Sequence, residues 1–223
     1  MGAPKRGLAK PGEPVTAEQR VCHEHLVLTG RAAYDPDMDG ALRERLLTVE
    51  DLYELPDDGR RYELEAGRLL AEPPPGARHG LVTAVVVRLL GDFARAQGLG
   101  VVFTADAGFI LARSPDTLRG PDAAFVSKTR FDKVGAVPTA FPGPPDLVVE
   151  VLSPSDRAAE VRAKVADYLA AGTSVVWVVD PESQCVTVYR SLLAPRVLAV
   201  GDELAGEDIL PGFTVRVAEL FEF

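Results

Sequence analysis

A single carboxylate inside an otherwise apolar segment is the feature that most constrains the fold of this chain. Glu150 lies in PDLVVEVLSPSD, with apolar residues on both sides. Alternation along a strand places Glu150 on the same face as Val148 and Leu152, and the odd-numbered residues on the other face. Both faces are apolar, so both are expected to be buried. A buried charge costs several kcal/mol unless it is paired, protonated or bound to a metal. We therefore expect Glu150 to point into a cleft, or to form a structural ion pair with a distant arginine.

The segments around Glu150 predict a mixed α/β domain. A helix over 157–171 follows SPSD, and three further strands are predicted in TSVVWVVD, QCVTVYR and PRVLAV. Upstream, residues 79–97 have apolar residues at helical spacing, and RRYELEAGRLLAE predicts a hairpin that turns at Ala66-Gly67. Hairpins around a long helix, followed by strand–helix–strand, indicate a central mixed sheet with flanking helices.

Shorter elements complete the prediction. Thr48 and Asp51 form an acidic variant of a capping box at the start of the helix TVEDLYEL. GVVFTADAGFILA predicts two strands around a tight turn, and PDAAFVS a short buried strand. The Pro/Gly-rich stretch 135–145 predicts a loop, and PGFTVRVAELF closes the domain.

The first residues predict an extension rather than a part of the domain. Residues 1–40 are rich in Pro, Gly and Ala and have no sustained periodicity. We expect 1–46 to be poorly ordered or loosely packed and 47–223 to form the domain. VCHEHLVL, within the extension, is either a strand or one helical turn. Its Cys22-His23-Glu24-His25 run contains metal-binding atoms, but the spacing matches no zinc pattern.

Composition excludes several classes of protein. There is no apolar run near the roughly 18 residues of a membrane span, and no apolar stretch follows the first basic residues as in a secretory signal. Two cysteines are too few for a disulfide scaffold, which favours a cytoplasmic protein. Phosphate-binding loops, GxGxxG and GxSxG are absent from the sequence.

Net charge counts against a strong nucleic-acid binder. Residues 48–223 hold 17 basic and 26 acidic side chains, which accounts for the whole net charge of −9. Nucleic-acid binding draws much of its affinity from phosphate neutralisation by lysine and arginine. A local basic groove would be needed, although a cluster of acidic metal ligands would itself contribute to the imbalance.

A second carboxylate, Asp122, opens the strand AAFV directly after Pro121. Taken alone, it is as compatible with a turn or capping residue as with function. Mg²⁺ prefers oxygen ligands and keeps several waters, so one or two carboxylates on rigid strands are enough to hold it. We expect Asp122 and Glu150 to converge on one cation, with oxygens roughly 4–6 Å apart when the site is empty, because Mg–O bonds are about 2.1 Å.

Three other residues are candidates for the same site. Lys164 lies on the apolar face of the helix 157–171; its side chain reaches solvent, pairs with Glu160, or enters the site beside Glu150. Glu63, on the first strand of the hairpin, is directed either to the site or to the surface. His79 heads the long helix, where a capping or packing role is more common than a role as a ligand. The apolar face of the helix 157–171 consists of Val161, Val165, Tyr168 and Leu169.

The order of these motifs resembles the Uma-two family, restriction-endonuclease-like proteins of the PD-(D/E)XK nuclease superfamily. The motifs that carry the resemblance are Glu63 in YELEAG, Asp122 in RGPDAAFV, Glu150 in PDLVVEVLSPSD, Lys164 in the next helix, GTSVVWVVDP and LPGF. The resemblance covers residues 47–223. It implies a restriction-endonuclease-like fold, Mg²⁺- or Mn²⁺-dependent hydrolysis of nucleic acid (DNA before RNA), and a homodimer.

The resemblance also implies a role for each site residue. Asp122, Glu150 and the backbone carbonyl of Val151 would hold Mg²⁺, and Glu63 would hold a second ion or orient water. The superfamily pattern has lysine two residues after the second acid, where this chain has Leu152. Lys164 fits a displaced position for that lysine, from which it would stabilise phosphate charge.

Two other functions are compatible with the sequence. The first is a nuclease fold that no longer cleaves and serves as a binding module, which fits the net charge of −9 better. The second is a structural or dimerising protein in which Glu150 and Lys164 form a buried pair.

Overall fold

The computed structural model describes residues 45–56, 58–136 and 139–223. The predicted extension over 1–46, apart from its last two residues, therefore lies outside the described part, as does the run from Cys22 to His25. The described helices are α3 (Val49–Tyr53), α4 (Ala77–Gln97), α5 (Lys128–Val134), α6 (Ala158–Ala171) and the 3₁₀ helix η1 (Val217–Phe221).

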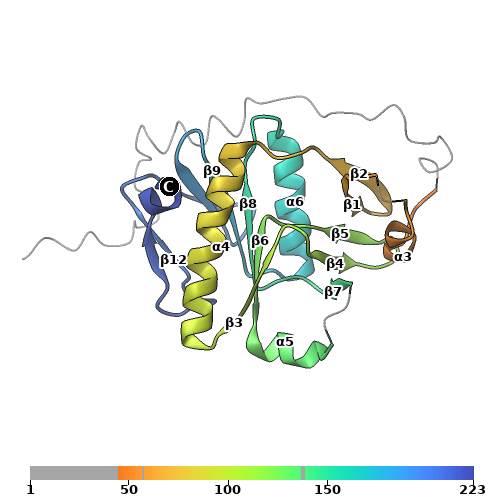
Figure 1. The fold of residues 1–223 in the computed structure, drawn as a ribbon, viewed down its shortest axis with the longest axis horizontal. Coiled ribbons are helices and arrows are strands. Elements are labelled where there is room, and N and C mark those ends of the chain that lie inside the picture. The colour runs from red at the N-terminus through yellow and green to blue at the C-terminus, as the bar shows by residue number, and fades with distance from the viewer. Residues whose placement is uncertain (1–44, 57, 137–138) are drawn as a thin grey trace, which may run out of the picture.

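A six-stranded mixed sheet forms the centre of the fold (Figure 1). Its strands, in spatial order, are β11 (Arg196–Leu198), β10 (Cys185–Tyr189), β9 (Val175–Asp180), β8 (Leu147–Val151), β6 (Ala123–Ser127) and β3 (Gly100–Thr104). The strands β8 and β9 are parallel and connected through α6, whereas the other neighbours are antiparallel. The sequence prediction of a central mixed sheet with flanking helices is therefore confirmed.

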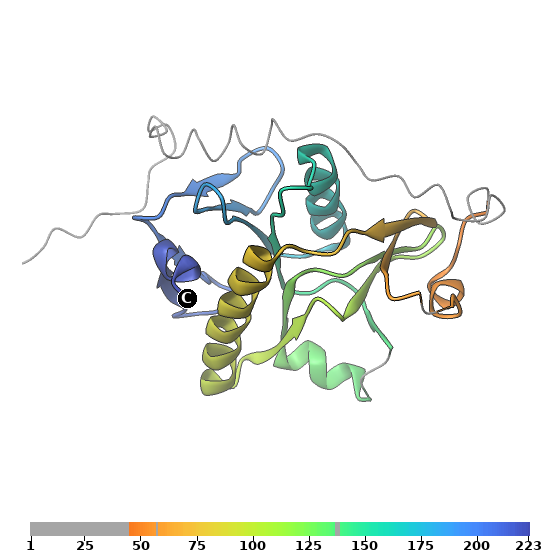
Figure 2. The same cartoon turned by 45° about the horizontal axis from the view of Figure 1, so that its top comes forward.

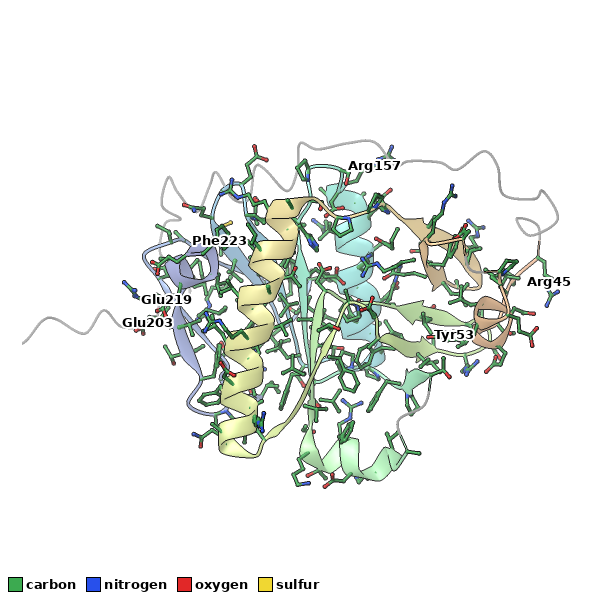
Figure 3. The ribbon with its side chains drawn as sticks, in the orientation of Figure 1. Arg45, Tyr53, Arg157, Glu203, Glu219 and Phe223 are labelled. Carbon is green, nitrogen blue, oxygen red and sulfur yellow. The ribbon has the colours of Figure 1, made fainter. Side chains whose placement is uncertain are left out.

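Helices α4 and α6 cover opposite faces of this sheet, and side chains fill the space between each helix and the strands (Figure 3). On α4, Val82, Val86 and Leu90 pack against the odd-numbered residues of β8 and β9. On α6, Val161 and Val165 pack against the even-numbered residues of the same strands. Both faces of β8 are buried, as its apolar sequence predicts. Glu150 belongs to the face that α6 covers.

A second sheet of five strands lies beside the first. In spatial order it contains β2 (Arg68–Glu72), β1 (Arg61–Glu65), β5 (Thr117–Arg119), β4 (Gly108–Ala112) and β7 (Ala140–Pro142). The predicted hairpin is β1–β2. Its turn residues Ala66 and Gly67 have φ values of 49° and 79°, the positive values that a two-residue type I′ turn requires.

Two predicted features differ from the structure. The strands around the turn after Thr104 are β3 and β4, but β3 pairs with β6 and β4 pairs with β5 and β7, so the chain crosses between the sheets at this turn. The predicted loop 135–145 contains β7, which has only three residues and lies at the sheet edge. Pro142 is compatible with that edge position because it pairs on one side only.

The C-terminal segments close the core on the other side of α4. The strands β12 (Glu203–Ala205) and β13 (Thr214–Arg216) form a small sheet, and η1 packs next to it. In both views, β12 and the C-terminus lie across α4 from the β1–β2 hairpin (Figures 1 and 2). The predicted capping box at Thr48 and Asp51 is present at the start of α3. None of the helices in the described ranges has the length and apolar character needed to cross a membrane.

Candidate active site

The register of two neighbouring strands brings the predicted carboxylates together. Asp122 directly precedes β6, and Ala123 pairs with Val149 of the antiparallel strand β8. Asp122 itself lies just outside β6, and its Oδ2 accepts a hydrogen bond from the N–H of Val151, the residue that follows Glu150. The side chains of Asp122 and Glu150 line one cavity of about 580 Å³. That Asp122 and Glu150 bind a metal ion, and how far apart their carboxylate oxygens lie, remain predictions.

The cavity lies where two helices begin. In Figure 1, α4 and α6 start at the same end of the molecule, and Figure 3 shows Arg157 at that end of α6. Apolar residues of β2 and of the segment that follows it line another part of the cavity: Leu69, Leu70, Ala71, Pro73 and Pro75. Six carboxylate residues but only three lysines or arginines are among the described lining residues. The cavity is therefore better suited to a cation than to an uncompensated phosphate.

Asp122 is held by two donors from different elements. Its Oδ2 accepts a hydrogen bond from the backbone N–H of Val151 at 2.7 Å and contacts Nε2 of His79 at 3.0 Å. His79 lies in the first turn of α4 and is buried. The structure thus adds His79 to the site, where the sequence favoured a capping or packing residue. Val151 contacts Asp122 through its backbone N–H. The role of the Val151 carbonyl as a metal ligand remains a prediction.

Glu150 is buried and accepts a hydrogen bond from the Tyr168 hydroxyl at 2.8 Å. Burial raises the pKa of Glu150 to about 8, and the negative charge of Asp122 adds to the rise, although Lys164 opposes it. Within the described ranges, Glu150 makes no ion pair with an arginine, so the alternative of a structural Arg–Glu pair is not supported. The sequence places Tyr168 on the apolar face of α6 but does not predict this bond.

Lys164 is directed inward and is held by two carboxylates. Its Nζ lies 3.0 Å from Glu72 Oε1 and 3.3 Å from Glu63 Oε2, and only 16% of the side chain is exposed. It therefore neither extends into solvent nor pairs with Glu160. Burial alone would lower the pKa of Lys164, but the nearby carboxylates, Glu150 foremost, raise it above its usual range. The ammonium therefore stays charged beside the cavity that it lines.

Glu63 is the anchor of a buried ionic network. Its Oε2 accepts from Arg119 Nη1 at 2.9 Å, and its Oε1 accepts from the backbone N–H of Gly120 at 2.8 Å. Burial alone would raise the pKa of Glu63, but Lys164 and Arg119 lower it. Arg119 also pairs with Asp167 and Glu65.

The network places Glu63 differently from the other four candidates, Asp122, Glu150, Lys164 and His79, which line the larger cavity. Glu63 lines a neighbouring cavity of about 290 Å³ rather than the one that contains Asp122. The sequence leaves its burial open and does not predict the role of Arg119. A buried arginine between apolar strand residues and a glycine carries no sequence signal of its own.

Asp122 and Glu150 are the two carboxylates that the sequence predicts as metal ligands. Among the described residues, no group of three or more His, Cys, Asp or Glu side chains is arranged to hold an ion. Mg²⁺ needs only one or two carboxylates, because waters and substrate oxygens complete its octahedron. Asp122 and Glu150 supply this number of oxygen donors from two rigid, hydrogen-bonded strands.

Comparison with known proteins shows the family and the fold of this chain. Residues 49–218 match the model of the Uma2 family, described as "Putative restriction endonuclease". Among solved structures, the chain is similar to "a putative nuclease belonging to DUF820" from Anabaena variabilis ATCC 29413. The TM-score is 0.69 and the identity 22%, over 78% of this chain and 97% of that one. No curated protein matches the sequence. The structural likeness confirms the predicted restriction-endonuclease-like fold, and the family match shows that the chain belongs to the Uma2 family of restriction-endonuclease-like proteins.

Proposed function

We propose that this protein is a metal-dependent endonuclease that hydrolyses phosphodiester bonds in nucleic acid, with DNA as the first substrate to test. The observation that carries the proposal is that Asp122 and Glu150 line one cavity, with Asp122 hydrogen-bonded to the backbone N–H of Val151, the residue next to Glu150. The family and the fold support the same reaction class. Neither fixes the substrate.

Asp122 and Glu150 are the residues that would hold Mg²⁺ or Mn²⁺. Burial raises the pKa of Glu150 to about 8. The surrounding protein therefore does not fully offset the free-energy cost of burying the negative charge of this carboxylate. A divalent cation would supply the missing compensation. Asp122 is already fixed through Oδ2, which favours Oδ1 as its metal-binding oxygen. When bound, the ion would polarise the scissile phosphate and activate water.

Lys164 would supply the fixed positive charge of the site. Its ammonium stays charged, lines the cavity, and is held by carboxylates on β1 and β2. A preorganised charge of this kind stabilises the negative charge that develops on a phosphate in the transition state. Because the carboxylate of Glu63 already has Arg119, Gly120 and Lys164 as partners, we assign it to positioning Lys164 rather than to a second ion.

The alternative is a nuclease fold that binds but no longer cleaves. The observation that favours it is the pairing of Lys164 with Glu63 and Glu72, which offsets the charge that catalysis would use. The net charge of −9 points the same way. A homodimer in the cytoplasm stays a prediction from sequence, and sedimentation of the purified chain tests its oligomeric part.

A cleavage assay separates these possibilities. The purified chain is incubated with supercoiled plasmid, single-stranded DNA and RNA, in Mg²⁺, in Mn²⁺ and in EDTA. Glu150→Gln keeps the shape of the side chain and an acceptor for Tyr168 but removes the charge, so we expect cleavage to fall by at least ~10²-fold. Glu160→Gln, also on the cavity wall, is the matched control and should cleave normally.

Two results would contradict the proposal. One is a folded chain that cleaves none of these substrates with either ion, which favours the binding module. The other is a Glu150→Gln variant as active as the wild type, which would show that cleavage does not depend on Glu150 and would remove it from the proposed metal site.

A further inference from the structure

We infer that His79 is a positioning residue that fixes which oxygen of Asp122 meets the cation. The inference rests on the proposed metal site and deepens it. The structure places the imidazole between the start of α4 and the start of β6, where it lines the same cavity as the two carboxylates. Sequence spacing gives no hint of this role, because His79 and Asp122 are 43 residues apart.

The contact geometry defines the role. Nε2 of His79 lies 3.0 Å from Oδ2 of Asp122, and the N–H of Val151 reaches the same oxygen at 2.7 Å. Two donors on one oxygen, from a helix and a strand, fix the plane of the carboxylate. The other oxygen, Oδ1, is then the one available to a cation. Without His79, one donor would remain and the carboxylate could rotate about it.

The other ring nitrogen is compatible with this arrangement. When the ring is neutral, a proton on Nε2 leaves Nδ1 as an acceptor. The hydroxyl of Thr83, one turn further along α4, lies 3.5 Å from Nδ1, at the long limit of a hydrogen bond. A hydroxyl can donate in this direction, so the helix itself supports the tautomer that donates to Asp122.

Burial makes the arrangement rigid. Both partners are buried, so water competes little for Nε2 or Oδ2. Removing a group that orients a metal ligand in this way usually lowers metal affinity 10–100-fold. His79 would therefore act on the metal through Asp122 and not by direct ligation.

The first test measures Mn²⁺ affinity by electron paramagnetic resonance of the full chain. We expect His79→Ala to weaken Mn²⁺ binding about 10–100-fold. We expect His79→Gln to recover most of the loss, because its amide N–H reaches about as far as Nε2. Arg78→Ala changes the exposed neighbour on the same helix turn and should bind like the wild type. Thermal unfolding of each variant shows whether the fold is retained.

The second test needs no metal. In ¹⁵N-labelled protein we expect His79 to carry its proton on Nε2, shielded from exchange, and this signature to be lost in Asp122→Asn. The signature together with weaker Mn²⁺ binding by His79→Ala supports the inference. The signature with unchanged Mn²⁺ affinity overturns it and leaves a structural hydrogen bond. A wild-type chain that binds no Mn²⁺ removes the proposed metal site itself and, with it, the role of His79.

Discussion

Replacing Arg119 with methionine should destabilise the fold around the candidate site more than any surface substitution. Arg119 is 2% exposed, and its guanidinium lies 2.9 Å from the equally buried carboxylate of Glu63. Methionine fills most of the same space, so the main loss is the charge. Glu63 would then remain buried with one cationic partner fewer.

The magnitude follows from the contacts that remain. Removing one partner of a buried ion pair typically costs about 3–5 kcal/mol, because the other charge is left uncompensated. Glu63 would keep the N–H of Gly120 at 2.8 Å and Lys164 at 3.3 Å. We therefore expect the lower end, about 3 kcal/mol of unfolding free energy. In a domain of this size that lowers Tm by roughly 6–12 °C.

Urea unfolding followed by tryptophan fluorescence measures this loss, since Trp177 is buried in the core. Lys128→Met removes an exposed pair with Asp132 and should cost only about 0.3–0.5 kcal/mol. Adding Glu63→Gln to Arg119→Met removes the stranded charge and should restore at least about 1 kcal/mol. A loss below about 1 kcal/mol for Arg119→Met, or no recovery in the double variant, would refute the reasoning.

Three further predictions concern catalysis, pH and ligand binding. Lys164→Met should lower cleavage by at least ~10²-fold while the fold is retained; a wild-type rate would remove Lys164 from the mechanism. Asp116→Asn should reduce stability at pH 7 by about 1.5–3 kcal/mol. Two backbone N–H groups and Arg113 lower the pKa of Asp116, against the opposing effect of burial. A lowered carboxyl pKa adds stability above the ordinary value near 3.9, so the difference from wild type should begin to shrink below about pH 4 and be lost as pH falls through the lowered pKa of the folded state. A constant difference from pH 7 to pH 3 would contradict this. Nucleic-acid binding, measured by fluorescence anisotropy with Lys164→Met, which keeps both proposed metal ligands, should be stronger in Ca²⁺ than in EDTA because carboxylates outnumber basic residues in the cavity; equal affinity in both would contradict the charge argument.

The central elements could be predicted because local pattern and tertiary environment agree. The apolar run around Glu150 required burial on both faces of the strand, and α4 and α6 provide it. Alternation within that run also predicted correctly that Glu150 and Val149 lie on opposite faces of the sheet. The sequence also placed Lys164 on the apolar face of α6, but it left open whether the side chain reaches solvent, pairs with Glu160 or enters the site. Periodicity reports which face is buried, so these features followed from short windows of sequence.

The partners of the site residues could not be predicted in this way. Lys164 and Glu63 are 101 residues apart, and His79 and Asp122 are 43 apart. Such contacts depend on how two sheets and two helices meet, which no local window contains. The edge strand β7 was missed for a different reason: three residues with a proline resemble a loop until β4 supplies a partner.

The contacts of Lys164 are compatible with the displaced position that the resemblance predicts for the superfamily's lysine. Leu152 stands two residues beyond Glu150 and packs against the apolar residues of α6, so the position that the superfamily pattern gives to lysine serves the core here. The carboxylates that hold an ammonium, Glu63 and Glu72, are on the β1–β2 hairpin, which α6 faces across the cavity. An ammonium on α6 reaches both of them, and they hold its charge in place despite burial. The lysine and its carboxylates therefore form one unit, and the strand position needs only an apolar side chain.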